Sequence, residues 1–193
     1  MGGAMARFWI DVYQRHFQKH FQKPFDVQVY HDARGFGLKV ATFDWALRNR
    51  RVYASIGLAD KLVEHDEEEF GEVILIADVP DKEVPLLFVN ALFFVLQNDI
   101  PLGSRFSIGG IAKTQPAFAE RYHKTALYFA LAGEEDEHVN KVRNGADFGR
   151  VYQAHFITAE EDKYLADFGP DEFEKLFAKL GDQRDALRRE SCV

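Results

Sequence analysis

The chain has 193 residues, of which 47% are hydrophobic and 14% aromatic, and it carries a formal net charge of −7. This composition excludes an intrinsically disordered chain, and the acidic balance disfavours a nucleic-acid-binding protein. No apolar run reaches the roughly 18 to 20 residues of a membrane-spanning helix, no cleavable signal precedes the fold, and the lone Cys192 excludes an internal disulfide, so we expect a cytoplasmic protein.

The chain begins with a predicted helix. Between residues 6 and 21, apolar side chains recur every three or four positions, which is typical of a helix with one buried side. Its polar side carries His16 and His20, one turn apart, a spacing at which two imidazoles can bind a metal ion. No HExxH pattern supplies further ligands, so we interpret the pair as exposed surface histidines. A metal-dependent enzyme remains the least favoured alternative.

The next segments predict a sheet. Alternating polar and apolar residues indicate a hairpin of two strands at 25–30 and 38–43. Residues 52–56 alternate as well, and residues 73–77 are apolar throughout, which indicates a central strand buried on both faces. One face of the strand at 52–56 carries Val52, Ala54 and Ile56. We expect residues 1–22 to pack as a helix on a single domain that spans residues 23–193.

Two acidic runs contain no Lys or Arg. The first comprises Glu64, Asp66, Glu67, Glu68, Glu69 and Glu72, and the second contains Glu134, Glu135 and Asp136. A run of like charges is most often a solvated loop. The alternative that we retain is a patch that steers and docks a basic protein surface.

The middle of the chain predicts a buried helix followed by further strands. Residues 86–97 are apolar on almost all sides, and Pro85 suits the first turn of such a helix. An irregular strand is predicted from Phe106 to Ile111 because two glycines interrupt it. Two further strands are expected at 125–131 and 149–157.

The last part of the chain predicts helices. Thr158 and Glu161 have the spacing of a capping box, so we expect a helix that continues to Phe168. A second helix is predicted at 172–180, and we expect the charged tail from residue 182 onward to be helical and frayed.

No catalytic constellation is evident. The chain has no Gly-x-Ser-x-Gly elbow, and Cys192 near the end is poorly placed for a nucleophile. Ser55 and His155 lie within predicted strands, and we interpret both as hydrogen-bonded residues of the sheet. We therefore assign no catalytic, cofactor-binding or metal-binding residue.

Four stretches carry a family resemblance. They are YASIGLAD at 53–60, GEVIL at 71–75, the apolar helix at 86–97 with the following LG, and VYQAHFITAEE at 151–161. In this order they resemble the Suppressor of Fused domain family. The resemblance implies an α+β domain whose mixed or antiparallel central sheet is covered by helices.

The resemblance also implies a function in protein binding, without enzymatic chemistry or a cofactor. Animal members hold zinc-finger transcription factors between two domains, and their peptide-binding Tyr and Asp fall near Phe94 and Ser104, which lack those polar groups. Single-domain members are similar to bacterial proteins that are thought to be immunity proteins, each neutralising a cognate toxin.

Our leading hypothesis is a bacterial immunity protein that occludes a basic toxin. The alternative is a regulatory adaptor that binds an extended peptide at a sheet edge. The candidate partner-binding residues are Glu64, Asp66, Glu67, Glu68, Glu69, Phe94, Ser104, Phe106, Glu134, Glu135 and Asp136.

Overall fold

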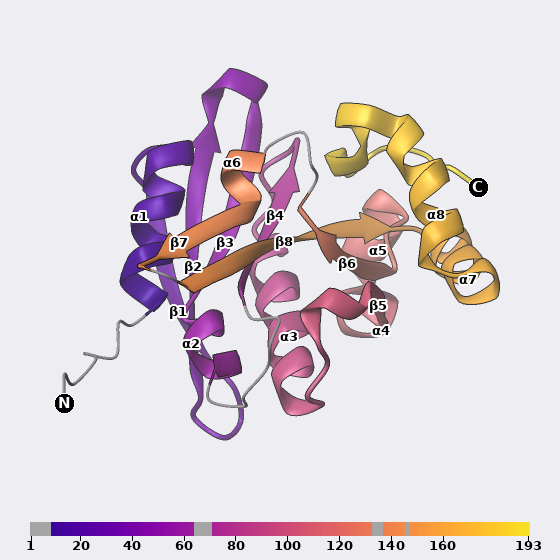
Figure 1. Ribbon diagram of the computed structural model, residues 1–193. Coiled ribbons are helices and arrows are strands. Elements are labelled where there is room, and N and C mark those ends of the chain that lie inside the picture. Colours follow the sequence, from indigo (N-terminus) through magenta and orange to yellow (C-terminus); the bar gives the residue numbers. More distant parts are fainter. Residues whose placement is uncertain (1–8, 64–70, 133–136, 146) are drawn as a thin grey trace, which may run out of the picture.

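The computed structural model describes residues 9–63, 71–132, 137–145 and 147–193 (Figure 1). Their strands form one sheet in the order β1-β2-β3-β4-β8-β6-β5, and β7 pairs with β8 outside this path. The strands are β1 (Asp26–His31), β2 (Gly37–Trp45), β3 (Arg50–Ile56), β4 (Gly71–Ala77), β5 (Phe106–Gly109), β6 (Ala126–Leu131), β7 (Lys141–Asn144) and β8 (Asp147–Ile157). Only β4 and β8 pair in parallel, so the sheet is mixed and mostly antiparallel, as predicted.

Helices cover both faces of this sheet. They are α1 (Trp9–Phe21), α2 (Leu58–Val63), α3 (Val84–Gln97), α4 (Ile111–Thr114), α5 (Pro116–Tyr122), α6 (Glu137–Asn140), α7 (Ala159–Phe168) and α8 (Pro170–Phe177). The 3₁₀ segments in the described ranges are η1 (Ala46–Arg48), η2 (Leu102–Ser104) and η4 (Ala178–Asp185). Within the described ranges, no helix combines the length and apolarity that crossing a bilayer requires.

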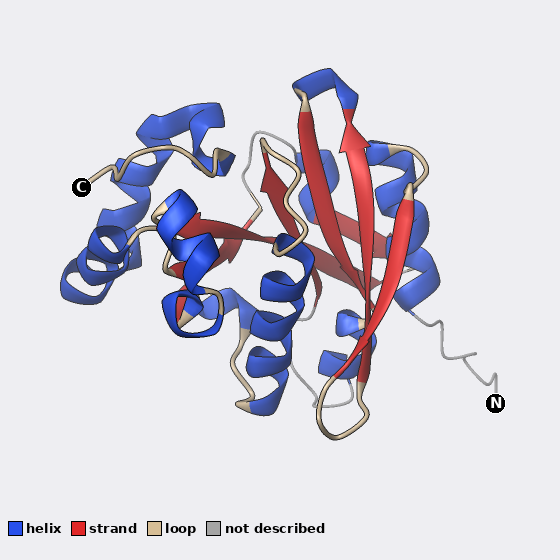
Figure 2. Ribbon diagram, turned by 180° about the vertical axis from the view of Figure 1, so that it is seen from behind, coloured by secondary structure: helices blue, strands red, loops and turns tan. Residues whose placement is uncertain are grey.

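The alternation of β3 and β4 sets the two faces. Tyr53 and Leu75 pack in a core with α3, which Figure 2 shows lying across one face of the sheet. Val52 and Ile74 point the other way and pack with α1. All seven residues of β4 are buried, which confirms the predicted central strand.

The face that carries α1 is shared between two helical layers. α1 covers β2, β3 and β4, whereas α7 and α8 cover β6 and the end of β8 through a separate apolar cluster that includes Tyr128 and Phe173. In Figure 1, α1 lies on one side of the molecule and α8 on the other. The middle of this face, over β4 and β8, therefore lies between the two layers.

An aromatic ladder fixes α1 to the sheet. Its buried side chains Trp9, Tyr13, Phe17 and Phe21 are spaced by four residues. Successive ring centroids lie 5.7, 6.0 and 6.3 Å apart. Asp60 of α2 accepts hydrogen bonds from the first two backbone amides of the helix, at 2.7 and 3.0 Å, which satisfies donors that have no partner within the helix. The predicted N-terminal helix is thus confirmed over its described residues.

Several short elements differ from the prediction. Ile111 begins α4 rather than ending a strand, because β5 stops at Gly109 and Gly110 adopts a positive φ of 104°. The helices α2 and α5 and the β7–β8 hairpin were not predicted.

The end of the chain is docked rather than helical and frayed. η4 ends at Asp185, and the following residues extend along the protein with Leu187 almost fully buried. Arg189 donates to Glu161 of the capping box at 2.5 and 3.0 Å and to the backbone oxygen of Phe156 at 3.1 Å. The tail is therefore part of the folded structure, because a buried ion pair holds it.

Candidate functional site

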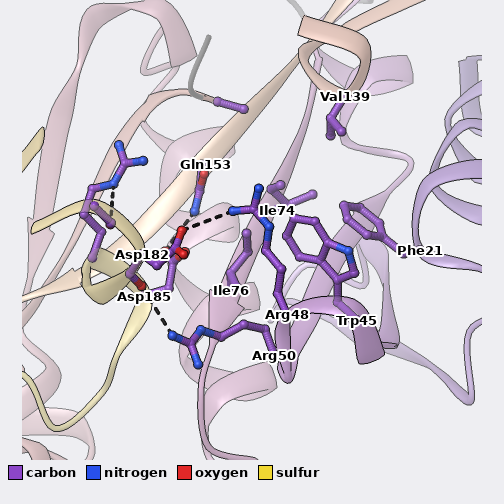
Figure 3. Close-up of a pocket in the computed structure, with 13 residues that line it drawn as sticks. Phe21, Trp45, Arg48, Arg50, Ile74, Ile76, Val139, Gln153, Asp182 and Asp185 are labelled. Carbon is purple, nitrogen blue, oxygen red and sulfur yellow. Dashed lines mark hydrogen bonds and ion pairs between the residues drawn. The ribbon is translucent and has the colours of Figure 1, made fainter. Parts of the chain in front are cut away.

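A hollow lies between the two helical layers on the α1 face. Its floor is formed by Ile74 and Ile76 of β4 and Gln153 of β8, and it is bounded by α1, η1 and η4 (Figure 3). Its volume is about 210 Å³. The hollow exists because α1 and η4 both pack on the sheet but do not meet over β4.

One side of the hollow is aromatic. Phe21 at the end of α1 meets Trp45 at the end of β2 edge-on, with ring centroids 5.3 Å apart. The guanidinium of Arg48 lies over the Trp45 ring at 4.8 Å, a cation–π contact. Together with the two isoleucines of the floor, these rings give this side of the hollow an apolar surface.

The opposite rim is charged. Asp182 of η4 pairs with Arg48 across the hollow at 3.2 Å, and its side chain is 77% exposed. Arg50 donates to the backbone oxygen of Asp182 at 3.4 Å. Because these contacts lie at the surface, they cost little to break.

Asp185 attaches η4 to the sheet beneath the rim. Its Oδ1 accepts a hydrogen bond from Nε2 of Gln153 at 2.9 Å, and Nδ1 of His155 lies 3.1 Å from the same oxygen. His155 is 6% exposed. The prediction that His155 is a hydrogen-bonded sheet residue is confirmed, and its position beside the hollow is structural.

The size of the hollow matches one large side chain. Pockets for drug-sized ligands measure roughly 300 to 1,000 Å³. An apolar cavity of about 150 Å³ already accepts benzene. The hollow, at about 210 Å³, therefore suits a single aromatic or aliphatic side chain better than a cofactor.

The histidine pair on α1 is not exposed as expected. His16 and His20 are half-buried, and their ring centroids lie 4.6 Å apart. Nε2 of His16 lies 2.8 Å from the backbone oxygen of Val139, and burial lowers the pKa of its imidazole. Among the described residues, no group of three His, Cys, Asp or Glu is arranged to hold a metal ion.

Those candidate contact residues from the sequence that the structure describes do not line the hollow. Phe94 is 46% exposed on α3, and Ser104 is exposed at the end of η2, where its hydroxyl donates to the oxygen of Pro101 at 2.6 Å. Phe106 opens β5 and stacks on Phe129 with centroids 5.0 Å apart. Glu64, Asp66, Glu67, Glu68, Glu69, Glu134, Glu135 and Asp136 lie outside the described residues.

Glu72 is not part of an acidic surface run, because its side chain is fully buried. Its carboxylate accepts hydrogen bonds from the hydroxyl of Ser55 at 2.5 Å and from the backbone amides of Gly57 and Ala59 at 2.7 and 3.2 Å. The glutamate thus ties the end of β3 and the start of α2 to β4. The predicted role of Ser55 as a sheet residue is confirmed.

Neither a protein family model nor a curated protein matches this chain, whereas solved structures do. A crystal structure of a SUFU (suppressor of fused protein) homologue from Neisseria gonorrhoeae FA 1090 shares 15% identity, with a TM-score of 0.70 over 96% of this chain and 97% of that one. The chain has a Suppressor of Fused-like fold.

Two further structures share the Suppressor of Fused-like fold. The Sufu–Fu complex aligns with a TM-score of 0.63 and 11% identity over 95% of this chain and 90% of that one. Drosophila Suppressor of Fused aligns with a TM-score of 0.59 and 12% identity over 95% of this chain. This chain spans 50% of the Drosophila protein.

Proposed function

We propose that this protein is a non-enzymatic protein-binding domain that anchors one large side chain of its partner in the hollow. The observation that carries the proposal is a hollow of side-chain size, with an apolar wall of Trp45 and Phe21 and with exposed charged groups at its rim. Binding energy at protein interfaces concentrates in such pockets, with polar groups around them. The similarity of this chain to the structure of the Sufu–Fu complex also supports a function in protein binding.

The test is a native pull-down from the protein's own cells, with mass spectrometry of what co-elutes in stoichiometric amount. Trp45→Ala removes an aromatic wall, so we expect the affinity for the partner to fall at least tenfold, since truncated anchor residues cost about 2 kcal/mol or more. Phe168→Ala is the matched control, because Phe168 is 61% exposed on α7, outside the hollow. Equal capture by both variants would exclude the hollow as the binding site.

Within this class, we propose an immunity protein that neutralises a cognate toxin in the cytoplasm. The acidic runs of the sequence favour a basic partner, and they provide steering beyond the hollow. We expect the captured partner to be lethal when expressed alone and harmless when co-expressed with this protein. A captured partner that cells tolerate without this protein would remove the immunity role and leave the binding function.

A specific observation favours the adaptor as a second candidate. β1 forms one edge of the sheet, and Val27 and Val29 on one of its faces are 49% and 54% exposed. An exposed apolar edge strand can pair with an extended peptide. An adaptor would bind a short peptide as tightly as the parent protein, and Val27→Lys with Val29→Lys would weaken that binding while Trp45→Ala would not.

A further inference from the structure

The charged side chains around the hollow differ in how far groups of this chain already bind them. Its lining contains three arginines, Arg48, Arg50 and Arg184, and two aspartates. Both carboxylates are engaged by groups of this chain, Asp182 with Arg48 and Asp185 with Gln153 and His155. Among the described residues, the lining therefore holds one more positive than negative side chain, on a chain whose formal net charge is −7.

Arg50 has guanidinium donors that are unused within the described part of the chain. Its contact among the described residues is the hydrogen bond of 3.4 Å to the backbone oxygen of Asp182, which uses one of five guanidinium N–H groups. In contrast, Arg48 stacks on Trp45 and pairs with Asp182. A guanidinium binds a carboxylate with two parallel hydrogen bonds, and Arg50 has the donors for such a pair.

The aromatic wall and Arg50 face the same cavity. Trp45 and Arg50 are direct cross-strand partners in the register of β2 and β3. Cross-strand partners have Cβ atoms only about 4.5 to 5.5 Å apart. A ring seated against Trp45 thus places the neighbouring residue of the same segment within reach of Arg50.

We propose that the hollow recognises a protein segment in which an acidic side chain adjoins an aromatic one. The aromatic ring fills the space between Trp45 and the floor of Ile74 and Ile76, and the carboxylate pairs with Arg50. This inference rests on the proposed function, since it names the partner chemistry of the same site. It adds a preference for an acidic neighbour, which the apolar wall of the hollow alone would not provide.

The test uses capped dipeptides as probes. The probes are N-acetyl-Phe-Asp-amide and N-acetyl-Phe-Asn-amide, and the corresponding pair with the two residues in reversed order. Within each pair, the two dipeptides differ only in the charge of one isosteric side chain. Binding is followed at pH 7 by the amide NMR signals of residues that line the hollow. We expect the Asp dipeptide of one order to bind about fivefold more tightly than its Asn counterpart, the ratio that an exposed ion pair near the top of the measured range provides.

Two variants assign this preference to Arg50. Arg50→Gln is expected to equalise the affinities for the Asp and Asn dipeptides. Arg34→Gln is the matched control, because Arg34 is an exposed arginine of the β1–β2 turn that pairs with Asp32. It is expected to leave the fivefold ratio unchanged.

The outcomes separate the two proposals. Equal affinities of the Asp and Asn dipeptides, a preference that survives Arg50→Gln, or no shift of the hollow signals up to the solubility limit would each overturn the acidic-neighbour inference. The proposed function fails on a different result, namely capture of the natural partner by Trp45→Ala as efficiently as by the unchanged protein.

Discussion

At the scale of single residues, Glu72 carries a carboxyl group that the fold holds away from water. Its carboxyl group is fully buried, and this burial raises its pKa to about 7 although Ser55 and the amides of Gly57, Leu58 and Ala59 donate to it. The hydrogen-bond donors orient the carboxyl group of Glu72, and the absence of water around it disfavours its charged form. The junction of β3, α2 and β4 is therefore sensitive to pH.

The sign of this dependence follows from linkage. The folded pKa of Glu72 lies above the ordinary value of 4.5, so the folded protein holds the proton more tightly than the unfolded chain. The stabilising contribution is complete below pH 4.5 and is lost as the pH rises through 7, with a total on the order of 3 kcal/mol.

Urea unfolding at pH 5 and pH 7 measures this contribution. We predict that the unfolding free energy of the natural protein falls between these pH values by more than that of Glu72→Gln, which cannot titrate. Parallel pH profiles of the two proteins would show that Glu72 keeps an ordinary pKa.

The surroundings of Glu72 could not be foreseen from its sequence context. It follows a run of acids, and a run of like charges predicts a solvated loop. The strand pattern placed Ser55 in the sheet correctly, since alternation reports which residues share a face. Which carboxylate meets that hydroxyl depends on the pairing of β3 with β4, which no local pattern encodes.

At the scale of elements, the start of α7 and the tail of the chain stabilise each other. Thr158 and Glu161 form both hydrogen bonds of the capping box. The carboxylate of Glu161 also pairs with Arg189, and although burial opposes its charge, the arginine lowers its pKa overall. Both partners are almost fully buried, so loss of one leaves an uncompensated charge.

We predict that Arg189→Ala lowers the free energy of unfolding by about 3 to 5 kcal/mol, because Glu161 would remain buried without its partner. Arg188→Ala provides the matched control, since Arg188 is the exposed neighbour in the same tail. Chemical unfolding of the three proteins compares them directly. A loss below 1 kcal/mol for Arg189→Ala would mean that the tail is not anchored by this pair.

The helices and strands that could be predicted were those with a clear pattern of capping or apolar residues in the sequence. α7 was predicted over its observed residues because a capping box marks its first turn, and the aromatic spacing of α1 indicated its buried side. The helices α2, α4 and α5 are too short for a clear period. The tail was predicted to fray because its charges are abundant, and only the fold reveals that one of them meets Glu161.

At the scale of the whole molecule, two helical layers share one face of the sheet and leave a hollow where they do not meet. Its residues come from α1, β2, η1, β3, β4, α6, β8 and η4, which span most of the sequence. The family resemblance indicated the fold, but its candidate positions Phe94 and Ser104 lie away from this hollow. No sequence motif joins Trp45, Ile74 and Asp182, so the site could be found only after the chain was folded.

The most direct test of this account is site-specific photocrosslinking in the protein's own cells. A benzoylphenylalanine is placed at position 48 on the rim of the hollow, at position 94 on α3 or at position 29 on the edge strand β1. We predict that a stoichiometric partner crosslinks from position 48 and not from the other two. Crosslinking from position 94 or 29, with none from position 48, would contradict the assignment of the hollow as the binding site.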